Sequence, residues 1–179
     1  MNNKVIIDSS QIVYSGFFNV REDTIKIDGN SGKVTSLILL REAAIILPQD
    51  INGNFILNYE YRHGIQSYTY NCPGGLIEPN EELISAAKRE LLEETGYTAD
   101  MIYLASVYPM PSICNQAVHY FFAPNAKKIQ QPKLDPLELL EIKLFSKDQL
   151  LSLLSSSNTI DATLPISYTF YKQYQDSHA

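Results

Sequence analysis

The alternation of apolar and polar positions predicts that residues 1–70 form mainly β-structure. Short runs rich in β-branched and aromatic residues are separated there by Gly, Asn and Asp. Strands are expected at residues 11–18, 24–27, 34–40, 43–47 and 55–61. The clearest turn sequences are Asp28-Gly29-Asn30 and the stretch 50–53, which ends in Asn52-Gly53 and reaches positive φ easily. We therefore expect antiparallel hairpins in this part of the chain.

The most regular helical pattern covers residues 81–95, which contain strong helix formers and neither Gly nor Pro. Three apolar residues recur there at four-residue spacing along one face: Leu83, Ala87 and Leu91. Asn80 is expected to be the N-cap, and Gly96 suits the left-handed position that ends a helix. This segment is the most secure helix of the chain.

Strand-like runs resume after this helix and are followed by further helical patterns. The expected strands are residues 102–108, 117–122 and 139–145, and the expected helices are residues 147–154 and 162–174. Strands, a helix, strands and then helices predict an α+β fold with a mixed sheet rather than a doubly wound parallel sheet. The 179 residues suit one main domain, residues 41–179, preceded by a small β extension, residues 1–40.

The charge and the cysteines exclude several classes of protein. A net charge of -6 argues against a nucleic-acid backbone as partner, because that contact needs clustered Lys and Arg. No secretory signal and no membrane-spanning segment are expected, so we expect a cytoplasmic protein. Cys72 and Cys114 are expected to be reduced thiols, and their spacing does not suit a zinc site.

Three carboxylates lie at helical spacing within the predicted helix. Glu90 and Glu94 are one turn apart and Glu93 is their neighbour, so all three can point to one side. Like charges at this spacing repel, and a divalent cation with hard oxygen ligands, Mg²⁺ or Mn²⁺, is the natural compensation. The alternative is an exposed acidic face with Arg89 as a surface ion-pair partner.

The complete spacing of this segment resembles the Nudix box: a Gly, five residues, a Glu, seven residues, then Arg-Glu-apolar-x-Glu-Glu-x-Gly-apolar. The matching positions are Gly75, Glu81, Arg89, Glu90, Leu91, Glu93, Glu94, Gly96 and Tyr97. Only Tyr97 is a soft match, since the family usually has an aliphatic residue there. The resemblance implies a Nudix-type α/β/α sandwich with a mixed sheet, preceded by a small N-terminal antiparallel sheet. It also implies Mg²⁺-dependent hydrolysis of a diphosphate.

The resemblance also assigns roles to residues of the box. Glu90 and Glu94 are expected to bind Mg²⁺ directly, and Glu93 either shares the metal or handles the attacking water. Arg89 would orient the glutamates, and Glu81 would support the metal site. Gly74 would supply a backbone carbonyl as a further ligand. Such a metal ion neutralises charge on a diphosphate and lowers the pKa of bound water.

The flanking sequence looks like the ADP-ribose and nucleotide-sugar pyrophosphatases, in which an aromatic-Arg pair precedes the box. Tyr61-Arg62 matches that pair. Arg62 could bind a phosphate of the substrate bidentately, although such an Arg is often only a solvated surface residue. The resemblance implies a nucleoside diphosphate sugar as substrate, with ADP-ribose favoured and AMP and ribose 5-phosphate as products.

One position departs from the ADP-ribose hydrolases. Pro111 fits a Pro of that subgroup, but Gln116 stands where a Glu that assists water activation is expected. An amide cannot act as a general base. Either another carboxylate such as Glu138 or Glu141 takes that role, or Glu93 does, or the substrate is a different nucleotide sugar. Pro111 and Gln116 are retained as expected substrate-binding positions.

Other substrates, a role without catalysis and a dimer are further interpretations of the sequence. The substrate could be another nucleoside diphosphate derivative, or the chain could be a non-catalytic sensor of ADP-ribose or a nucleotide. Tyr14, Phe17 and Phe18 lie in the N-terminal β segment, which in relatives contributes to base binding and often to a dimer interface. A homodimer is therefore expected.

Overall fold

The computed structural model describes residues 4–134, 139–156 and 159–178. The backbone divides into two compact units. The N-terminal unit contains Met1–Glu42 and Val107–Ala117, and the core unit contains Ala43–Ser106 and Val118–Ala179. Each unit is described by itself below.

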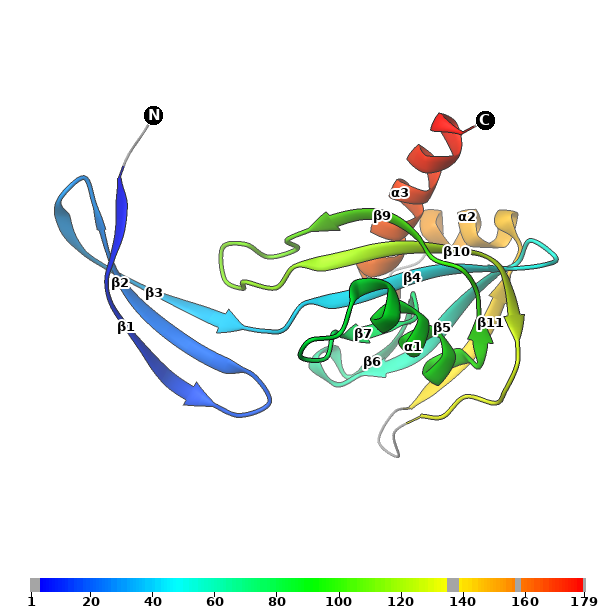
Figure 1. Ribbon diagram of the computed structural model, residues 1–179, viewed down its shortest axis with the longest axis horizontal. Coiled ribbons are helices and arrows are strands. Elements are labelled where there is room, and N and C mark those ends of the chain that lie inside the picture. The colour runs from blue at the N-terminus through cyan, green and yellow to red at the C-terminus, as the bar shows by residue number, and fades with distance from the viewer. Residues whose placement is uncertain (1–3, 135–138, 157–158, 179) are drawn as a thin grey trace. The chain divides into compact units, whose positions relative to one another are not determined.

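The N-terminal unit is built on a three-stranded antiparallel sheet of order β1-β2-β3 (Figure 1). Its strands are β1 (Val5–Ser15), β2 (Asn19–Ile27) and β3 (Asn30–Leu39). The predicted turn at Asp28-Gly29 joins β2 to β3, and both residues adopt positive φ. The predicted strand over residues 11–18 ends earlier, at Ser15, because residues 16–18 form the turn into β2.

The core unit contains a mixed sheet of order β11-β5-β4-β10-β8. Its strands are β4 (Ala43–Asp50), β5 (Phe55–Arg62), β6 (Ser67–Asn71), β7 (Gly74–Leu76), β8 (Tyr97–Thr98), β9 (Ile102–Val107), β10 (Val118–Lys128) and β11 (Leu140–Phe145). β6, β7 and β9 pair with β5, β4 and β10 respectively. β10 runs parallel to β4, whereas β5 is antiparallel to both β4 and β11. The predicted mixed sheet is confirmed.

Helices cover both faces of this sheet: α1 (Leu83–Thr95) on one face and α3 (Thr163–Ser177) on the other, with α2 (Lys147–Ser156) contacting β11 (Figure 1). Ile46 of β4, Phe121 of β10 and Leu91 of α1 belong to one buried apolar cluster. The next residue, Phe122, points to the opposite face, where its ring lies 4.7 Å from that of Tyr171 in α3. These alternating contacts produce the expected α/β/α sandwich.

The start of α1 differs from the sequence prediction. Glu82, not Asn80, occupies the N-cap position, and no side chain caps the helix there. Asn80 instead adopts φ 65° in a turn that Glu81 closes by donating its backbone N–H to the carbonyl of Glu78 at 3.0 Å. The carboxylate of Glu81 accepts the Glu78 N–H in return, so this turn replaces the first predicted turn of helix. The helix ends as predicted, with Gly96 in the left-handed conformation.

The part of the chain that the structure describes holds no helix that is both long enough and apolar enough to cross a membrane.

Candidate active site

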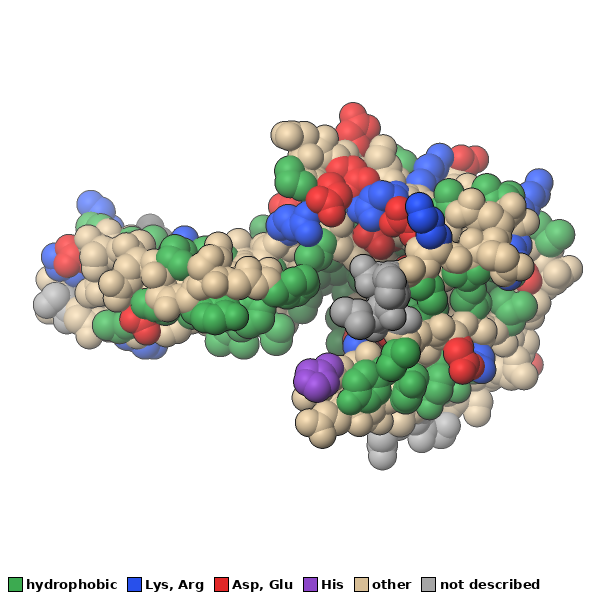
Figure 2. All heavy atoms as spheres, turned by 90° about the horizontal axis from the view of Figure 1, so that it is seen from below, with side chains coloured by type: hydrophobic (Ala, Val, Ile, Leu, Met, Phe, Trp, Pro, Cys, Tyr) green, Lys and Arg blue, Asp and Glu red, His purple; other side chains and the backbone are tan. Residues whose placement is uncertain are grey.

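Arg89 lies at the centre of a group of glutamates on α1 and the turn before it. Its guanidinium binds Glu81 through two hydrogen bonds, from Nε at 2.8 Å and from Nη2 at 2.9 Å. Nη1 donates to Glu90 at 2.6 Å and to Glu93 at 3.2 Å. Figure 2 shows acidic and basic side chains gathered together on one face of the core unit. One guanidinium therefore holds three of the predicted carboxylates together.

The Arg89 contacts hold both partners in their charged forms. The hydrogen bonds from Arg89 lower the pKa of Glu81 to about 2, and the bond with Glu81 raises the pKa of Arg89 further. Nη2 of Arg89 also donates to the carbonyl oxygen of Leu76 at 3.1 Å, which ties α1 to strand β7. Arg89 therefore fixes the glutamates relative to the sheet as well as to one another.

The two glycines before the helix allow the backbone to approach these carboxylates. A Cβ on Gly75 would lie 2.6 Å from Oε1 of Glu90, so no side chain fits there unless Glu90 moves. A Cβ on Gly74 would lie 2.2 Å from the carbonyl oxygen of Ala44, and Gly74 has a φ of 153° that favours glycine. The predicted role of this pair in close backbone approach agrees with the geometry.

Glu94 is a partly buried carboxylate of the group. Burial raises its pKa to about 8, and the charges of Glu90 and Glu60 act in the same direction. Two donors oppose this effect by binding Oε2: the backbone N–H of Gly74 at 2.9 Å and Nδ2 of Asn58 at 2.8 Å. Asn58 is absent from the sequence-based set of site residues. The only feature of the sequence that marks Asn58 is that an amide directly follows the apolar residues 55–57.

The carboxylates fit a hard divalent cation in chemistry, although they do not form a finished ligand cage. Among residues 4–134, 139–156 and 159–178, no three His, Cys, Asp or Glu side chains converge closely enough to hold a metal ion. Arg89 binds Glu90 and Glu93, while Asn58 and Gly74 bind Glu94. The donor atoms of these side chains are carboxylate oxygens. Oxygen donors of this kind suit Mg²⁺ or Mn²⁺.

Arg62 occupies the end of β5, on the same face of that strand as Asn58 and Glu60. Its Nη1 binds Glu60 at 2.8 Å, and its Nε lies 3.8 Å from the carboxylate of Asp161. The second oxygen of Glu60 accepts a hydrogen bond from Asn71 at 3.0 Å. Arg62 is thus anchored by carboxylates, while 41% of its side chain remains exposed to a ligand.

Pro111 and Gln116 lie in the N-terminal unit. Pro111 is in a turn that Cys114 closes by donating its N–H to the carbonyl of Met110 at 2.9 Å. The side-chain amide of Gln116 donates to the carbonyl of Arg41 at 2.8 Å, so Gln116 ties its own segment to the end of the N-terminal sheet.

The structure excludes one of the alternative bases considered for the reaction. Glu141 is paired with Tyr59 in the β5–β11 ladder, so both side chains lie on the face opposite to Asn58 and Glu94. Lys143 binds Glu141 at 2.6 Å. Glu138, the other alternative, lies outside the described residues.

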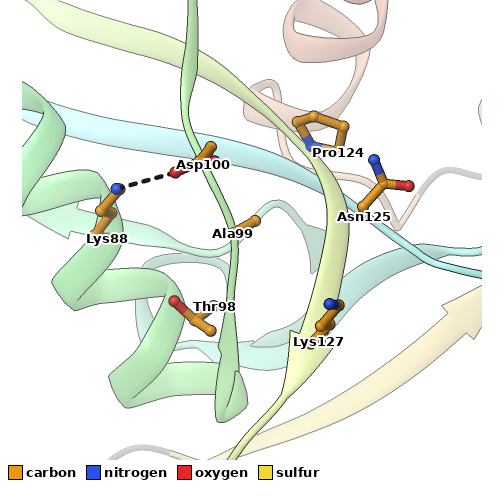
Figure 3. A pocket seen from close by; sticks show the side chains of 7 residues that line it. All are labelled: Lys88, Thr98, Ala99, Asp100, Pro124, Asn125 and Lys127. Carbon is orange, nitrogen blue, oxygen red and sulfur yellow. Dashed lines mark hydrogen bonds and ion pairs between the residues drawn. The ribbon is translucent and has the colours of Figure 1, made fainter.

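A separate hollow of about 420 Å³ lies beside α1, between β8 and β10 (Figure 3). Lys88, Asp100 and Lys127 contribute charged side chains to it, and Lys88 pairs with Asp100 at 3.4 Å. None of the clustered glutamates lines this hollow. It is therefore distinct from the carboxylate site.

Comparison with known proteins agrees with this geometry. The family model described as NUDIX domain matches residues 37–164. The chain is 25% identical over 158 residues to the ADP-ribose pyrophosphatase of Bacillus subtilis (strain 168), covering 87% of this chain and 85% of that protein. It is 26% identical over 147 residues to the CMP-5'-(N-acetyl-N-hydroxy-3-aminopropyl)phosphonate hydrolase of Streptomyces rubellomurinus (strain ATCC 31215), covering 82% and 71% of the two chains.

A crystal structure of an ADP compounds hydrolase superimposes on this chain with a TM-score of 0.87 at 24% identity. The match covers 98% of this chain and 96% of the other, so the two share their fold, including the small N-terminal sheet. The match of the family model over residues 37–164, together with the glutamates around Arg89, shows that the chain belongs to the Nudix hydrolases and is a pyrophosphohydrolase similar to ADP-ribose pyrophosphatases.

Proposed function

We propose that this enzyme hydrolyses the pyrophosphate bond of ADP-ribose and releases AMP and ribose 5-phosphate. The observation that carries the proposal is the set of glutamates that Arg89 and Gly74 hold on α1 and the turn before it. The similarity to the ADP-ribose pyrophosphatase of Bacillus subtilis favours ADP-ribose among the possible diphosphates.

The metal ligands in this proposal are Glu90, Glu93 and Glu94, with the carbonyl of Gly74 as a backbone ligand. A Mg²⁺ ion held there supplies charge neutralisation for the diphosphate and an acidified water, and Mn²⁺ has the same ligand preference. Gly75 leaves room for the carboxylate of Glu90 beside the backbone. Arg89 holds the carboxylates of Glu90 and Glu93 close together, so that a cation bound there can take over part of the charge neutralisation that Arg89 provides.

Glu93 is the residue best suited to accept a proton from the attacking water. Its side chain is 46% exposed, more than that of Glu90 or Glu81, and its hydrogen bond with Arg89 is long, at 3.2 Å. A carboxylate held in this way can rotate toward a water molecule without losing a strong partner. Glu81 acts through Arg89 and orients it. Arg62, whose side chain is 41% exposed, binds a phosphate of the substrate.

The test is a set of substrates assayed with Mg²⁺ and with Mn²⁺: ADP-ribose, other nucleoside diphosphate sugars, dinucleoside polyphosphates and nucleoside triphosphates. ADP-ribose should be hydrolysed with the highest kcat/KM. Glu93→Gln and Glu94→Gln should each lower kcat at least about 100-fold, since both remove a carboxylate of the reaction. Glu82→Gln is the matched control, because Glu82 occupies the N-cap position outside the carboxylate group. Full activity in both site variants would sink the proposal.

A different nucleoside diphosphate derivative is the second candidate substrate. Gln116, whose side-chain amide donates to the carbonyl of Arg41, stands where a glutamate is expected in the ADP-ribose hydrolases. In addition, the phosphonate hydrolase of Streptomyces rubellomurinus is as similar to this chain as the ADP-ribose pyrophosphatase. A CMP-linked compound in the substrate set separates the two candidates. Binding of ADP-ribose without any turnover would instead favour a sensor.

We also propose that the N-terminal unit joins two copies of the chain in a homodimer. Large apolar side chains are exposed on its strands and on the turn between β1 and β2, where Phe17 is 87% exposed. Figure 2 shows these hydrophobic side chains on the surface of the N-terminal unit. Exposed apolar area of this kind is typical of an interaction surface.

A further inference from the structure

Asn58 is a buried amide in the middle of the core sheet. It pairs across the strand ladders with Ile142 of β11 and with Asn71 of β6, and its exposed fraction is 0%. The three residues before it in β5, Phe55 to Leu57, are also fully buried and apolar. An amide at such a position is unfavourable unless its polar atoms find partners, because they lose their hydrogen bonds to water.

The hydrogen bonds of Asn58 are only half satisfied. Nδ2 donates to Oε2 of Glu94 at 2.8 Å, whereas Oδ1 is buried and has no hydrogen-bond partner among the described residues. An apolar residue of similar size would avoid that unmet acceptor. The stability of the fold therefore does not explain the presence of Asn at this position, and the contact with Glu94 is the interaction that requires it.

The contact with Asn58 fixes the orientation of Glu94. The N–H of Gly74 donates to the same oxygen, Oε2, at 2.9 Å. Two donors from different strands on one oxygen restrict rotation of the carboxylate and leave Oε1 for another ligand. Neither donor carries a charge, so the carboxylate is held in place without the neutralisation that a Lys or Arg would bring. This is the arrangement that a ligand of a divalent cation requires from its supporting residues.

We infer that Asn58 is a positioning residue of the metal site and acts through Glu94. The inference rests on the proposed function, in which Glu94 is a metal ligand. In this role Asn58 acts only through its contact with Glu94 and supplies no ligand atom of its own. It sets the direction in which Glu94 presents Oε1, from a sheet position that belongs to no part of the Nudix box.

The test measures binding of Mn²⁺ alone, by electron paramagnetic resonance or calorimetry, so that it does not depend on turnover. Asn58→Leu, which keeps the size of the side chain and removes the donor, should weaken Mn²⁺ binding at least about 10-fold. Thr69→Val is the matched control, since it also removes a buried polar group without a partner among the described residues, on the neighbouring strand β6. That control should bind Mn²⁺ as the wild type does.

A double-mutant cycle shows whether Asn58 acts through Glu94. In a Glu94→Gln background, Asn58→Leu should change Mn²⁺ affinity less than about 2-fold, since the carboxylate that it orients is gone. An equal loss in both backgrounds would overturn the inference, and so would wild-type affinity in Asn58→Leu.

A second substitution keeps the test decisive if Asn58→Leu does not fold. Asn58→Ser retains a donor, so its Mn²⁺ affinity should lie between those of the wild type and Asn58→Leu. If Asn58→Leu gives no folded protein, the Mn²⁺ affinity of Asn58→Ser should be lower than that of the wild type by less than about 10-fold. Wild-type affinity in Asn58→Ser together with normal turnover would overturn the inference. A wild-type protein that neither binds Mn²⁺ nor hydrolyses any diphosphate would instead contradict the proposed function, so the two failures are distinguishable.

Discussion

Arg89 and Glu81 form a two-point contact, with Nε of the guanidinium 2.8 Å from Oε1 and Nη2 2.9 Å from Oε2. The same Nη2 reaches the carbonyl oxygen of Leu76 at 3.1 Å. One planar group therefore joins the turn before α1, the helix itself and strand β7. Only a guanidinium has enough donors in fixed directions to make these contacts together.

Arg89→Lys should lower both activity and stability although the charge is kept. An ammonium cannot bind Glu81 at two points and also reach Glu90, so we expect kcat to fall at least about 10-fold and the free energy of unfolding to fall by about 1–3 kcal/mol. Steady-state kinetics and urea denaturation measure the two effects. The control is Lys88→Gln, which removes only the ion pair with the exposed Asp100. Unchanged kinetics in Arg89→Lys would contradict the role of the two-point contact.

Gly75→Ala should affect activity much more than stability. The added Cβ meets the carboxylate of Glu90, the far end of a flexible side chain that can move aside at little cost. We therefore expect stability within about 1 kcal/mol of wild type but at least about a 10-fold loss of kcat, because Glu90 leaves its position. Gly64→Ala is the control, since nothing lies within 4 Å of its added Cβ.

Gly74→Ala, by contrast, brings the Cβ against the backbone carbonyl of Ala44, which cannot move aside. Its free energy of unfolding should fall by about 1–3 kcal/mol or more. Thermal or urea unfolding of the two glycine variants side by side provides the measurement. Equal stability in Gly74→Ala and Gly75→Ala would contradict the distinction between a Cβ that meets backbone, at Gly74, and a Cβ that meets a movable side chain, at Gly75.

The alkaline limit of stability should depend on Tyr120. Burial raises its pKa to about 12, and smaller interactions with Cys72 and with the carboxylate of Asp161 act in the same direction. Between about pH 10 and 12 the unfolded chain loses the phenol proton and the folded protein keeps it, so stability falls as the pH rises, by at most about 1.4 kcal/mol per pH unit. Below about pH 9 this group has almost no effect on the pH dependence.

Tyr120→Phe should remove that contribution. Urea denaturation at several pH values from 8 to about 10.5 should show a steeper decline for the wild type than for the variant. Tyr68→Phe is a suitable control because Tyr68 is exposed on β6. Parallel curves for wild type and Tyr120→Phe would argue against a buried neutral phenol.

The proposed dimer leads to a prediction about Ile12, which is 51% exposed on β1. The wild type should be a dimer by size-exclusion chromatography with light scattering, and Ile12→Asp should shift it toward the monomer, since a charge in an apolar interface is unfavourable. Ile51→Asp is the control, because Ile51 is similarly exposed but lies in the turn between β4 and β5 of the other unit. A monomeric wild type would contradict the proposal.

The sequence predicted the features that depend on neighbouring residues. Gly96 ends α1 because an αL position favours glycine, and Asp50 to Gly53 form the turn between β4 and β5. Hydrophobic spacing also identified the face of α1 that packs on the sheet, where Leu91 and Ala87 are fully buried. These features follow from local propensity and periodicity, which a single sequence displays directly.

The sequence did not predict features that depend on contacts between distant segments. Nothing near Asn58 shows that its amide meets Glu94, because the two residues come together only when β5 and α1 pack. Arg62 likewise obtains Asp161 as a partner from a segment far along the chain. The short strands β6, β7 and β8 were missed for the same reason, since their pairing with longer strands defines them and their own sequences do not.

The parallel pairing of β4 with β10 delays the completion of the core sheet during synthesis of the chain. Ala43 is opposite Val118, so the ladder must wait until most of the chain has left the ribosome. Phe121 and Ala123 of β10 belong to the same apolar cluster as Leu91 of α1. The helix with the glutamates that we propose as metal ligands thus lacks part of its support until β10 is made, and long-range parallel pairing of this kind is slow to form. We expect chains that stop before β10 to be inactive and prone to aggregation.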